Sequence, residues 1–142
     1  MKISTLMSYA HGFGGASREI VELEKAGLDV VWVPEAYSFD AVSAMGYLAA
    51  KTDRITIASG ILNIYSRSPS LMAMTAAGLD ELSSGRFMLG LGASGPQVIE
   101  GFHGIPYDAP VTRLREIIEI CRKVWLRDEK LNHVGKKYQI PL

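Results

Sequence analysis

The stretch Arg86-Phe87-Met88-Leu89-Gly90-Leu91-Gly92-Ala93-Ser94-Gly95 is a short apolar run that ends in a turn almost free of large side chains. Such a run is typical of a strand that is buried on both faces of a parallel sheet. Glycines at the carboxyl end of a strand let a large, flat ligand approach the backbone. Because α/β proteins bind ligands at the carboxyl ends of their strands, we predict that this turn forms one wall of a ligand site.

The same turn spells G-x-G-x-x-G from Gly90 to Gly95. A dinucleotide fingerprint opens a helix in the first strand-helix-strand unit and has an acidic residue about 20 positions later. Here Pro96 follows at once, three strand-helix units come before, and Asp108 lies nearer, in a predicted loop. We interpret the match as chance, and keep an open-sheet NAD(P)-binding domain as an alternative.

The composition indicates one compact domain with a substantial core, since 48% of the 142 residues are hydrophobic and 21% are charged. The formal net charge of +0 gives no basic excess that would attract nucleic acid. No apolar run is long enough to cross a bilayer, and the amino terminus lacks a secretion signal. With Cys121 as its one cysteine, the chain has no internal disulfide. We predict a cytoplasmic protein that acts on a small molecule.

A repeated strand-helix pattern organises the first two thirds of the chain. Strands are predicted at residues 3–7, 30–33, 55–58 and from 86 onward, and residues 9–15 are predicted as a flexible loop. Helices are predicted between an N-cap at Ser17 and Gly27, from a cap at Ser38 or Asp40 through residues 42–49, and from Pro69 to Leu82. Crossovers of this length connect parallel strands.

The predicted fold class is therefore α/β, as an open doubly wound sheet or as half of an eight-stranded barrel. A complete barrel takes about 250 residues, so the chain has room for about half of one. Beyond Gly95 we predict a short helix at residues 97–102 and a long helix at residues 111–126 that buries Cys121 and Trp125. A small hairpin is predicted at residues 131–140, turning near Gly135.

Several blocks of sequence resemble the amino-terminal half of the luciferase-like monooxygenase superfamily, and most of all its branch that uses the deazaflavin coenzyme F420. The blocks are Glu22–Asp29, Trp32–Glu35, Ile57–Ile61, Thr75–Arg86, Leu89–Gly95 and Tyr107–Pro110. The resemblance covers essentially the whole chain. It implies four (β/α) units of a TIM-type barrel with F420, or alternatively FMN, at the carboxyl face. It also implies hydride transfer to or from the cofactor, or flavin oxygenation.

The resemblance also implies where a cofactor is contacted. A non-proline cis peptide behind the cofactor ring corresponds to the bond between Gly60 and Ile61. The cofactor-binding residues that it implies are Glu35, Gly60, Ile61, Asn63, Gly92, Ala93 and Ser94. No metal site is expected, because His11, His103 and His133 lack ligand spacing with other His, Cys or Asp residues.

The chain departs from the family in two ways. Ala36 and Gly95 stand where some family dehydrogenases have a histidine and a glutamate, so no general acid or base carries over. The later strands, which supply phosphate-binding glycines in relatives, are absent from the 142 residues. We therefore expect little or no catalysis from this half alone, and a second copy or a complementing chain that completes the barrel. A non-catalytic half-barrel that acts through assembly is the alternative.

Overall fold

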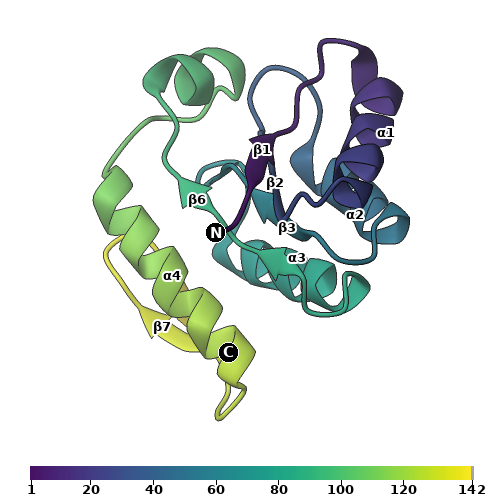
Figure 1. Cartoon of the computed structure of the whole chain (residues 1–142). Coiled ribbons are helices and arrows are strands. Elements are labelled where there is room, and N and C mark those ends of the chain that lie inside the picture. Colours follow the sequence, from purple (N-terminus) through teal and green to yellow (C-terminus); the bar gives the residue numbers. More distant parts are fainter. Residues whose placement is uncertain (142) are drawn as a thin grey trace. The chain divides into compact units, whose positions relative to one another are not determined.

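A computed structural model describes residues 1–141, which form two compact units (Figure 1). Unit 1 comprises Met1–Leu62 and Gly78–Gly90, and unit 2 comprises Asn63–Ala77 and the chain from Leu91 onward. Helix α3 (Pro69–Leu82) gives its first part to unit 2 and its last part to unit 1.

Unit 1 is built on a parallel sheet, as the crossover lengths predict. The sheet has four strands in the order β1-β2-β3-β5, with β1 at Ser4–Leu6, β2 at Val30–Val33, β3 at Thr56–Ser59 and β5 at Phe87–Met88. All three pairings are parallel. Helices α1 (Gly12–Lys25) and α2 (Ala41–Lys51) are the crossovers between β1, β2 and β3, and lie beside the sheet in Figure 1.

The strand register separates the sheet into a buried row and a partly open row. Val31 and Ile57 are partners and are almost fully buried. The next row is Leu6, Trp32, Ala58 and Met88, whose side chains share one face because registered residues of parallel strands point the same way. Leu6 and Met88 are 60% and 45% exposed at the two ends of this row. The sheet therefore presents apolar side chains at both of its edges.

Helix boundaries in unit 1 follow local capping, with one correction. The Asp40 carboxylate accepts hydrogen bonds from the Ser43 backbone and hydroxyl, so the predicted cap of α2 is confirmed. Gly27 has φ of +106° just beyond α1, as expected of a glycine that ends a helix. The predicted cap at Ser17 is wrong: α1 already begins at Gly12, and Ser17 is a buried helical residue whose hydroxyl donates to the Gly14 carbonyl.

The stretch from Arg86 to Gly95 begins with a strand, as predicted, but this strand is not buried on both faces, so that part of the prediction is wrong. The stretch contains two short strands, β5 and β6 (Leu91–Gly92), and β6 forms a separate two-stranded sheet with β4 (Leu62–Asn63). Within residues 1–141, β5 has a sheet neighbour on one side only, β3, which leaves Met88 exposed. The apolar run predicted a strand but could not indicate its place at the edge of the sheet.

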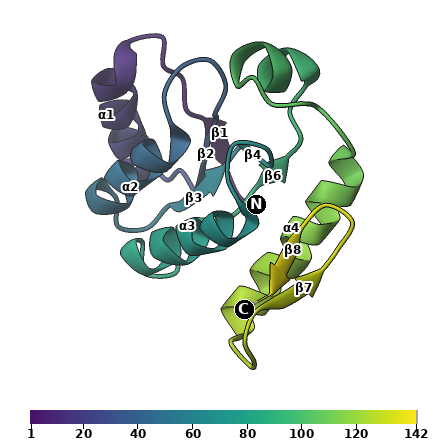
Figure 2. The same cartoon turned by 180° about the vertical axis from the view of Figure 1, so that it is seen from behind.

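Unit 2 combines a long helix with a hairpin. Helix α4 (Pro110–Leu126) and the antiparallel strands β7 (Asn132–Val134) and β8 (Gln139–Pro141) match the predicted helix and hairpin, and Figure 2 shows the hairpin lying along α4. The short predicted helix is a π-helix, η1 (Gln97–Phe102). Trp125 is less buried than predicted, at 44% exposed, but its indole N–H donates to the Ala73 carbonyl.

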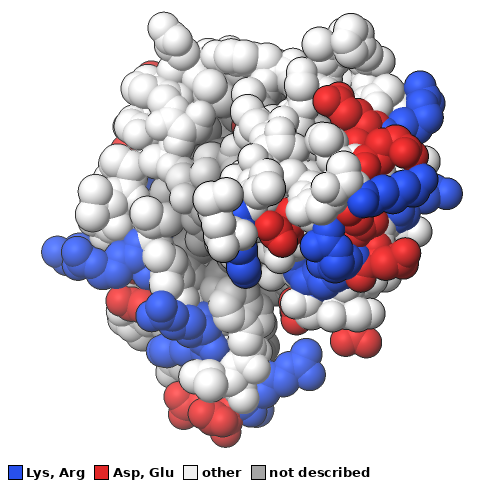
Figure 3. Space-filling model, in the orientation of Figure 1, with Lys and Arg blue, Asp and Glu red and all other residues white. Residues whose placement is uncertain are grey.

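Charged side chains of both signs are interleaved on the helical side of unit 1. On the face shown in Figure 3, acidic and basic groups alternate over the region of α1. Among residues 1–141, no helix combines the length and the apolar character that crossing a membrane requires.

Candidate functional site

The predicted cofactor residues of unit 1 lie at the carboxyl ends of two paired strands. Glu35 follows β2, and Gly60 and Ile61 follow β3; the register pairs Val33 with Ser59 just before them. The peptide bond between Gly60 and Ile61 is cis, as the resemblance implies. A Cβ atom on Gly60 would lie 3.2 Å from Trp32 Cβ, so the lack of a side chain suits this crowded position.

The Glu35 carboxylate takes part in the start of α2. Its Oε1 accepts a hydrogen bond of 3.2 Å from the Ala41 backbone N–H, the first residue of that helix. A carboxylate is favourable at a helix N-terminus because of the exposed N–H groups and the helix dipole. Glu35 therefore has a structural partner at the place where the resemblance implies a cofactor contact.

Gly90 has a packing function that the sequence did not indicate. The Ser59 hydroxyl donates to the Gly90 carbonyl at 2.9 Å and accepts from the Gly90 N–H at 2.8 Å. A Cβ on Gly90 would lie 2.1 Å from the Ser59 carbonyl oxygen. The first glycine of the turn thus lets two segments of unit 1 meet, rather than leaving room for a ligand.

The predicted cofactor-binding residues Asn63 and Gly92 of unit 2 are held by an Asx turn and by the pairing of two short strands. The Asn63 Oδ1 accepts hydrogen bonds from the backbone of Tyr65 and Ser66, which forms an Asx turn and leaves the Nδ2 donors as the polar end of the side chain. Asn63 and Gly92 belong to the paired strands β4 and β6, and the Ile64 N–H donates to the Gly92 carbonyl at 3.0 Å. The structure thus brings Asn63 and Gly92 together.

Ser94 lies in a left-handed conformation with φ of +55° and is exposed, and Ala93 is half-buried. The Tyr107 hydroxyl donates to the Ser94 carbonyl at 3.3 Å. After Gly95 comes the six-residue η1, and not the long helix that a dinucleotide fingerprint opens. The interpretation of Gly90 to Gly95 as a chance match agrees with this geometry.

An aromatic and charged cluster in unit 2 went unnoticed in the sequence. The Tyr65 and Tyr107 rings lie 5.3 Å apart, and the Tyr65 hydroxyl donates to the Asp108 carbonyl at 2.9 Å. The Arg113 guanidinium donates to the Asp108 carboxylate and lies over the rings of Tyr65 and Tyr138. Hydrogen bonds from Lys137 and Arg113 lower the pKa of Asp108. Tyr107 and Asp108 lie in a block that resembles the family, and this was the one sequence feature that could have indicated the cluster.

A second unpredicted group joins α4 to the hairpin. The buried Glu116 carboxylate accepts hydrogen bonds from three consecutive backbone amides, those of Lys136, Lys137 and Tyr138. His133 is also buried, and its Nε2 lies 3.6 Å from Glu116 Oε2. The sequence predicts that His133 is either structural or solvated, and the structure shows that it is structural. Within residues 1–141, no cluster of His, Cys, Asp or Glu could hold a metal ion.

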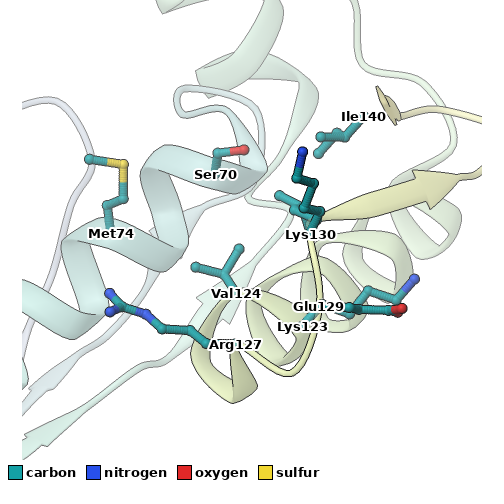
Figure 4. Close-up of a pocket in the computed structure, with 9 residues that line it drawn as sticks. Ser70, Met74, Lys123, Val124, Arg127, Glu129, Lys130 and Ile140 are labelled. Carbon is teal, nitrogen blue, oxygen red and sulfur yellow. The ribbon is translucent and has the colours of Figure 1, made fainter. Parts of the chain in front are cut away.

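A surface groove of about 420 Å³ lies in unit 2, as Figure 4 shows. Ser70 and Met74 of α3 face Val124 and Arg127 of α4 and its following turn across it. None of the predicted cofactor residues lines it. Because most of its lining side chains are exposed and its basic groups are in contact with solvent, we do not assign a ligand to this groove.

Curated relatives of the chain include F420-dependent enzymes. A Mycobacterium tuberculosis protein named as a putative coenzyme F420-dependent oxidoreductase is 39% identical over 123 residues, a match that covers 87% of this chain and 35% of that protein. The 5,10-methylenetetrahydromethanopterin reductase of Archaeoglobus fulgidus is 36% identical over 102 residues, covering 71% of this chain and 30% of that protein. The chain thus spans about a third of the length of these relatives.

Solved structures show the same fold. The coenzyme F420-dependent tetrahydromethanopterin reductase of Methanopyrus kandleri matches with a TM-score of 0.83 at 23% identity, over 99% of this chain and 44% of that chain. The oxygenating constituent of 3,6-diketocamphane monooxygenase from Pseudomonas putida, in complex with FMN, matches with a TM-score of 0.85 at 21% identity, again over 99% and 44%. These likenesses identify the fold as part of a TIM-type barrel.

The family itself is shown by sequence. Residues 2–141, nearly the whole chain, match the family described as luciferase-like monooxygenase. The parallel strand order, the helical crossovers and the small-residue segments after β3 and β5 agree with this match. The chain therefore belongs to the luciferase-like monooxygenase family.

Proposed function

We propose that the chain provides the amino-terminal half of the cofactor site of a luciferase-like oxidoreductase that uses F420. The observation that supports this most is the placement of Glu35 and Gly60–Ile61 at the carboxyl ends of the neighbouring parallel strands β2 and β3. That edge is where α/β barrels bind ligands. A bound deazaflavin would supply hydride transfer to or from a small-molecule substrate.

Each unit offers its own contacts. In unit 1, Glu35 provides a hydrogen-bond acceptor at the end of β2, and Gly60 and Ile61 provide backbone without a bulky side chain at the end of β3. In unit 2, the Asn63 amide and the backbone of Gly92, Ala93 and Ser94 provide donors and acceptors. These are polar groups of the kinds that bind the pyrimidine edge of a flavin or deazaflavin, so the residues fit the cofactor class.

The choice of F420 over FMN rests on the relatives. Two similar curated proteins, at 39% and 36% identity, carry names that refer to F420 or to methylenetetrahydromethanopterin reduction. The neighbour solved with FMN is more distant, at 21% identity. FMN remains the alternative cofactor in this proposal.

The test is a binding titration with F420 and with FMN, followed by cofactor fluorescence. The proteins compared are the 142-residue chain, a chimera that joins it to the carboxyl-terminal remainder of the Archaeoglobus fulgidus reductase, and that remainder alone. We expect the chimera to bind F420 more tightly than FMN and the other two to bind weakly or not at all. A chimera that is folded by circular dichroism but binds neither cofactor would contradict the proposal.

A second candidate function, assembly of half-barrels, is favoured by the sheet edges of unit 1. Among residues 1–141, β1 and β5 each have a sheet neighbour on one side only, and Leu6 and Met88 expose apolar surface there. Unpaired edges of this kind are sites of association between chains. We propose that strands of a second copy or of another polypeptide cover them.

Light scattering over a range of concentrations tests the assembly. The variant Met88→Lys places a charge at the β5 edge, and Leu82→Lys, on an exposed part of α3 within unit 1, is the matched control. We expect the wild type and the control to be larger than monomers and Met88→Lys to be monomeric. A monomeric wild type with protected amides in β1 and β5 would rule assembly out.

A further inference from the structure

Tyr9 carries a polar group that the fold of residues 1–141 does not use. It lies just after β1, at the same edge of the unit 1 sheet as Glu35 and Gly60. Its hydroxyl oxygen is buried, and within the described residues it has no hydrogen-bond partner. Buried polar groups are nearly always paired, so an unpaired hydroxyl at this edge calls for an explanation.

The two neighbouring carboxylates are engaged elsewhere. The Glu35 carboxylate accepts from the Ala41 N–H, and the Asp40 carboxylate accepts from the Ser43 N–H and hydroxyl. Burial, and then the negative charges of Asp40 and Glu35, raise the pKa of the Tyr9 hydroxyl. The phenol therefore keeps its proton at neutral pH and is a hydrogen-bond donor rather than an anion.

Aromatic packing fixes the Tyr9 ring. It meets the Phe39 ring edge-on at 5.2 Å, Phe39 meets Phe13 at 6.1 Å, and Phe13 meets Tyr47 at 5.4 Å. This aromatic row runs from the segment after β1 to α2. Phe39 is itself 47% exposed, so its side chain has room to change rotamer.

We propose that the Tyr9 hydroxyl donates a hydrogen bond to a ring oxygen or nitrogen of the flavin or deazaflavin bound at the carboxyl ends of β1 and β2. This inference rests on the proposed function and adds a donor that the resemblance does not imply. The cofactor supplies the acceptor that the protein lacks, and Phe39 moves aside when the cofactor enters. Tyr9 thus orients the cofactor as a hydrogen-bond donor, whereas Glu35 is an acceptor.

The test compares Tyr9→Phe with wild type in the chimera described above, again by titration with F420 and FMN. Losing one neutral hydrogen bond is expected to weaken binding of the preferred cofactor about fivefold. Removing an unpaired buried hydroxyl should leave the melting temperature of the cofactor-free protein unchanged or higher. Tyr47→Phe, which removes a hydroxyl from the other end of the aromatic row, is the matched control and should bind as wild type does.

A further variant separates the hydroxyl from the packing of the row. Phe39→Ala keeps the Tyr9 hydroxyl and removes the ring that lies against it, so any loss of binding should be smaller than that of Tyr9→Phe. Equal affinity of wild type and Tyr9→Phe overturns the inference alone, as does an equal loss in Phe39→Ala and Tyr9→Phe. If wild type binds neither cofactor, the proposed function fails and this inference fails with it.

Discussion

In each of the two units, one glutamate carboxylate accepts hydrogen bonds from three consecutive backbone amides, but the surrounding structure differs. In unit 1 the half-buried Glu24 carboxylate accepts hydrogen bonds from the consecutive amides of residues 53–55. In unit 2 the buried Glu116 carboxylate does the same for residues 136–138. Around Glu24 stand a four-stranded sheet and its helices, whereas Glu116 holds a two-stranded hairpin on a single helix.

The difference concerns how much structure depends on each carboxylate. The loop that Glu24 binds is also held by Arg86, whose guanidinium donates to the carbonyls of Ala49, Thr52 and Ile55. An isolated two-stranded hairpin is at best marginally stable, so the hairpin of unit 2 has fewer supports. We infer that losing Glu116 opens its segment more than losing Glu24 opens the loop of unit 1.

The largest expected effect is at Arg86. The variant Arg86→Met leaves several buried carbonyls of unit 1 without a donor, and we expect a loss of about 3 kcal/mol in the free energy of unfolding. Denaturation by urea measures it. Arg86→Lys keeps the charge but not the forked geometry and should recover only part of the loss.

Arg18→Met, on the exposed side of α1, is the control for Arg86 and should change the free energy of unfolding by less than about 0.5 kcal/mol. Equal stability of Arg86→Met and Arg18→Met would show that water replaces the guanidinium without cost. In that case Arg86 would add nothing to the stability of the loop of unit 1, and the contrast between the two units would disappear.

The reactivity of the Cys121 thiol tests whether the interior of unit 2 excludes water. Burial raises the pKa of the Cys121 thiol to about 11 from 9.0. At pH 8 the folded chain therefore holds about a hundredfold less thiolate than an unfolded one. Since the thiolate is the reactive form, labelling with a disulfide reagent should be slower by at least that factor in the folded protein than in urea. Similar rates would mean that α4 separates readily from its packing partners.

The parallel strands and most helix ends could be predicted from sequence because they depend on local signals. Asp40 lies just before an apolar helical pattern, and Pro69 follows a capping serine, so both helix starts follow from short-range chemistry. Ser17 misled the prediction because a serine within a helix has the same side chain as a cap. There the hydroxyl bonds back to the Gly14 carbonyl instead.

The resemblance indicated the cis bond after Gly60, but the tertiary contacts of the site could not be predicted. Tyr9 lies in a stretch predicted as flexible loop, and its ring packs against Phe39, thirty positions away. Glu116 and the amides that it binds are some twenty residues apart, with no periodic pattern to connect them. Met88 is apolar, as residues of buried strands usually are, and its exposure depends on the position of β5 in the sheet.

A smaller effect than that of Arg86 is expected at Glu116, on the opening of the hairpin. Burial alone would raise its pKa, but the backbone hydrogen bonds from Lys137, Tyr138 and Lys136, with the contribution of His133, lower it. The variant Glu116→Gln keeps the shape but removes the charge, so we expect hydrogen exchange at residues 136–138 to become about tenfold faster. Glu119→Gln, on the exposed side of the same helix, should leave these amides unchanged.

The smallest expected effect is at Glu24, and it depends on pH. Burial alone would raise the pKa of Glu24, but hydrogen bonds from Ile55, Arg54 and Asp53 and the charge of Arg86 hold it below the ordinary 4.5. The unfolded chain then binds more protons than the folded chain below about pH 4.5. The contribution of Glu24 is therefore complete above that pH and is lost as the pH falls through the folded value. Glu24→Gln should cost about 0.5 kcal/mol at pH 7, because solvent screens the partly exposed carboxylate, and less at pH 2. Urea unfolding at both pH values measures the difference; a cost that is the same at both would assign the contribution of Glu24 to shape and neutral hydrogen bonding rather than to charge.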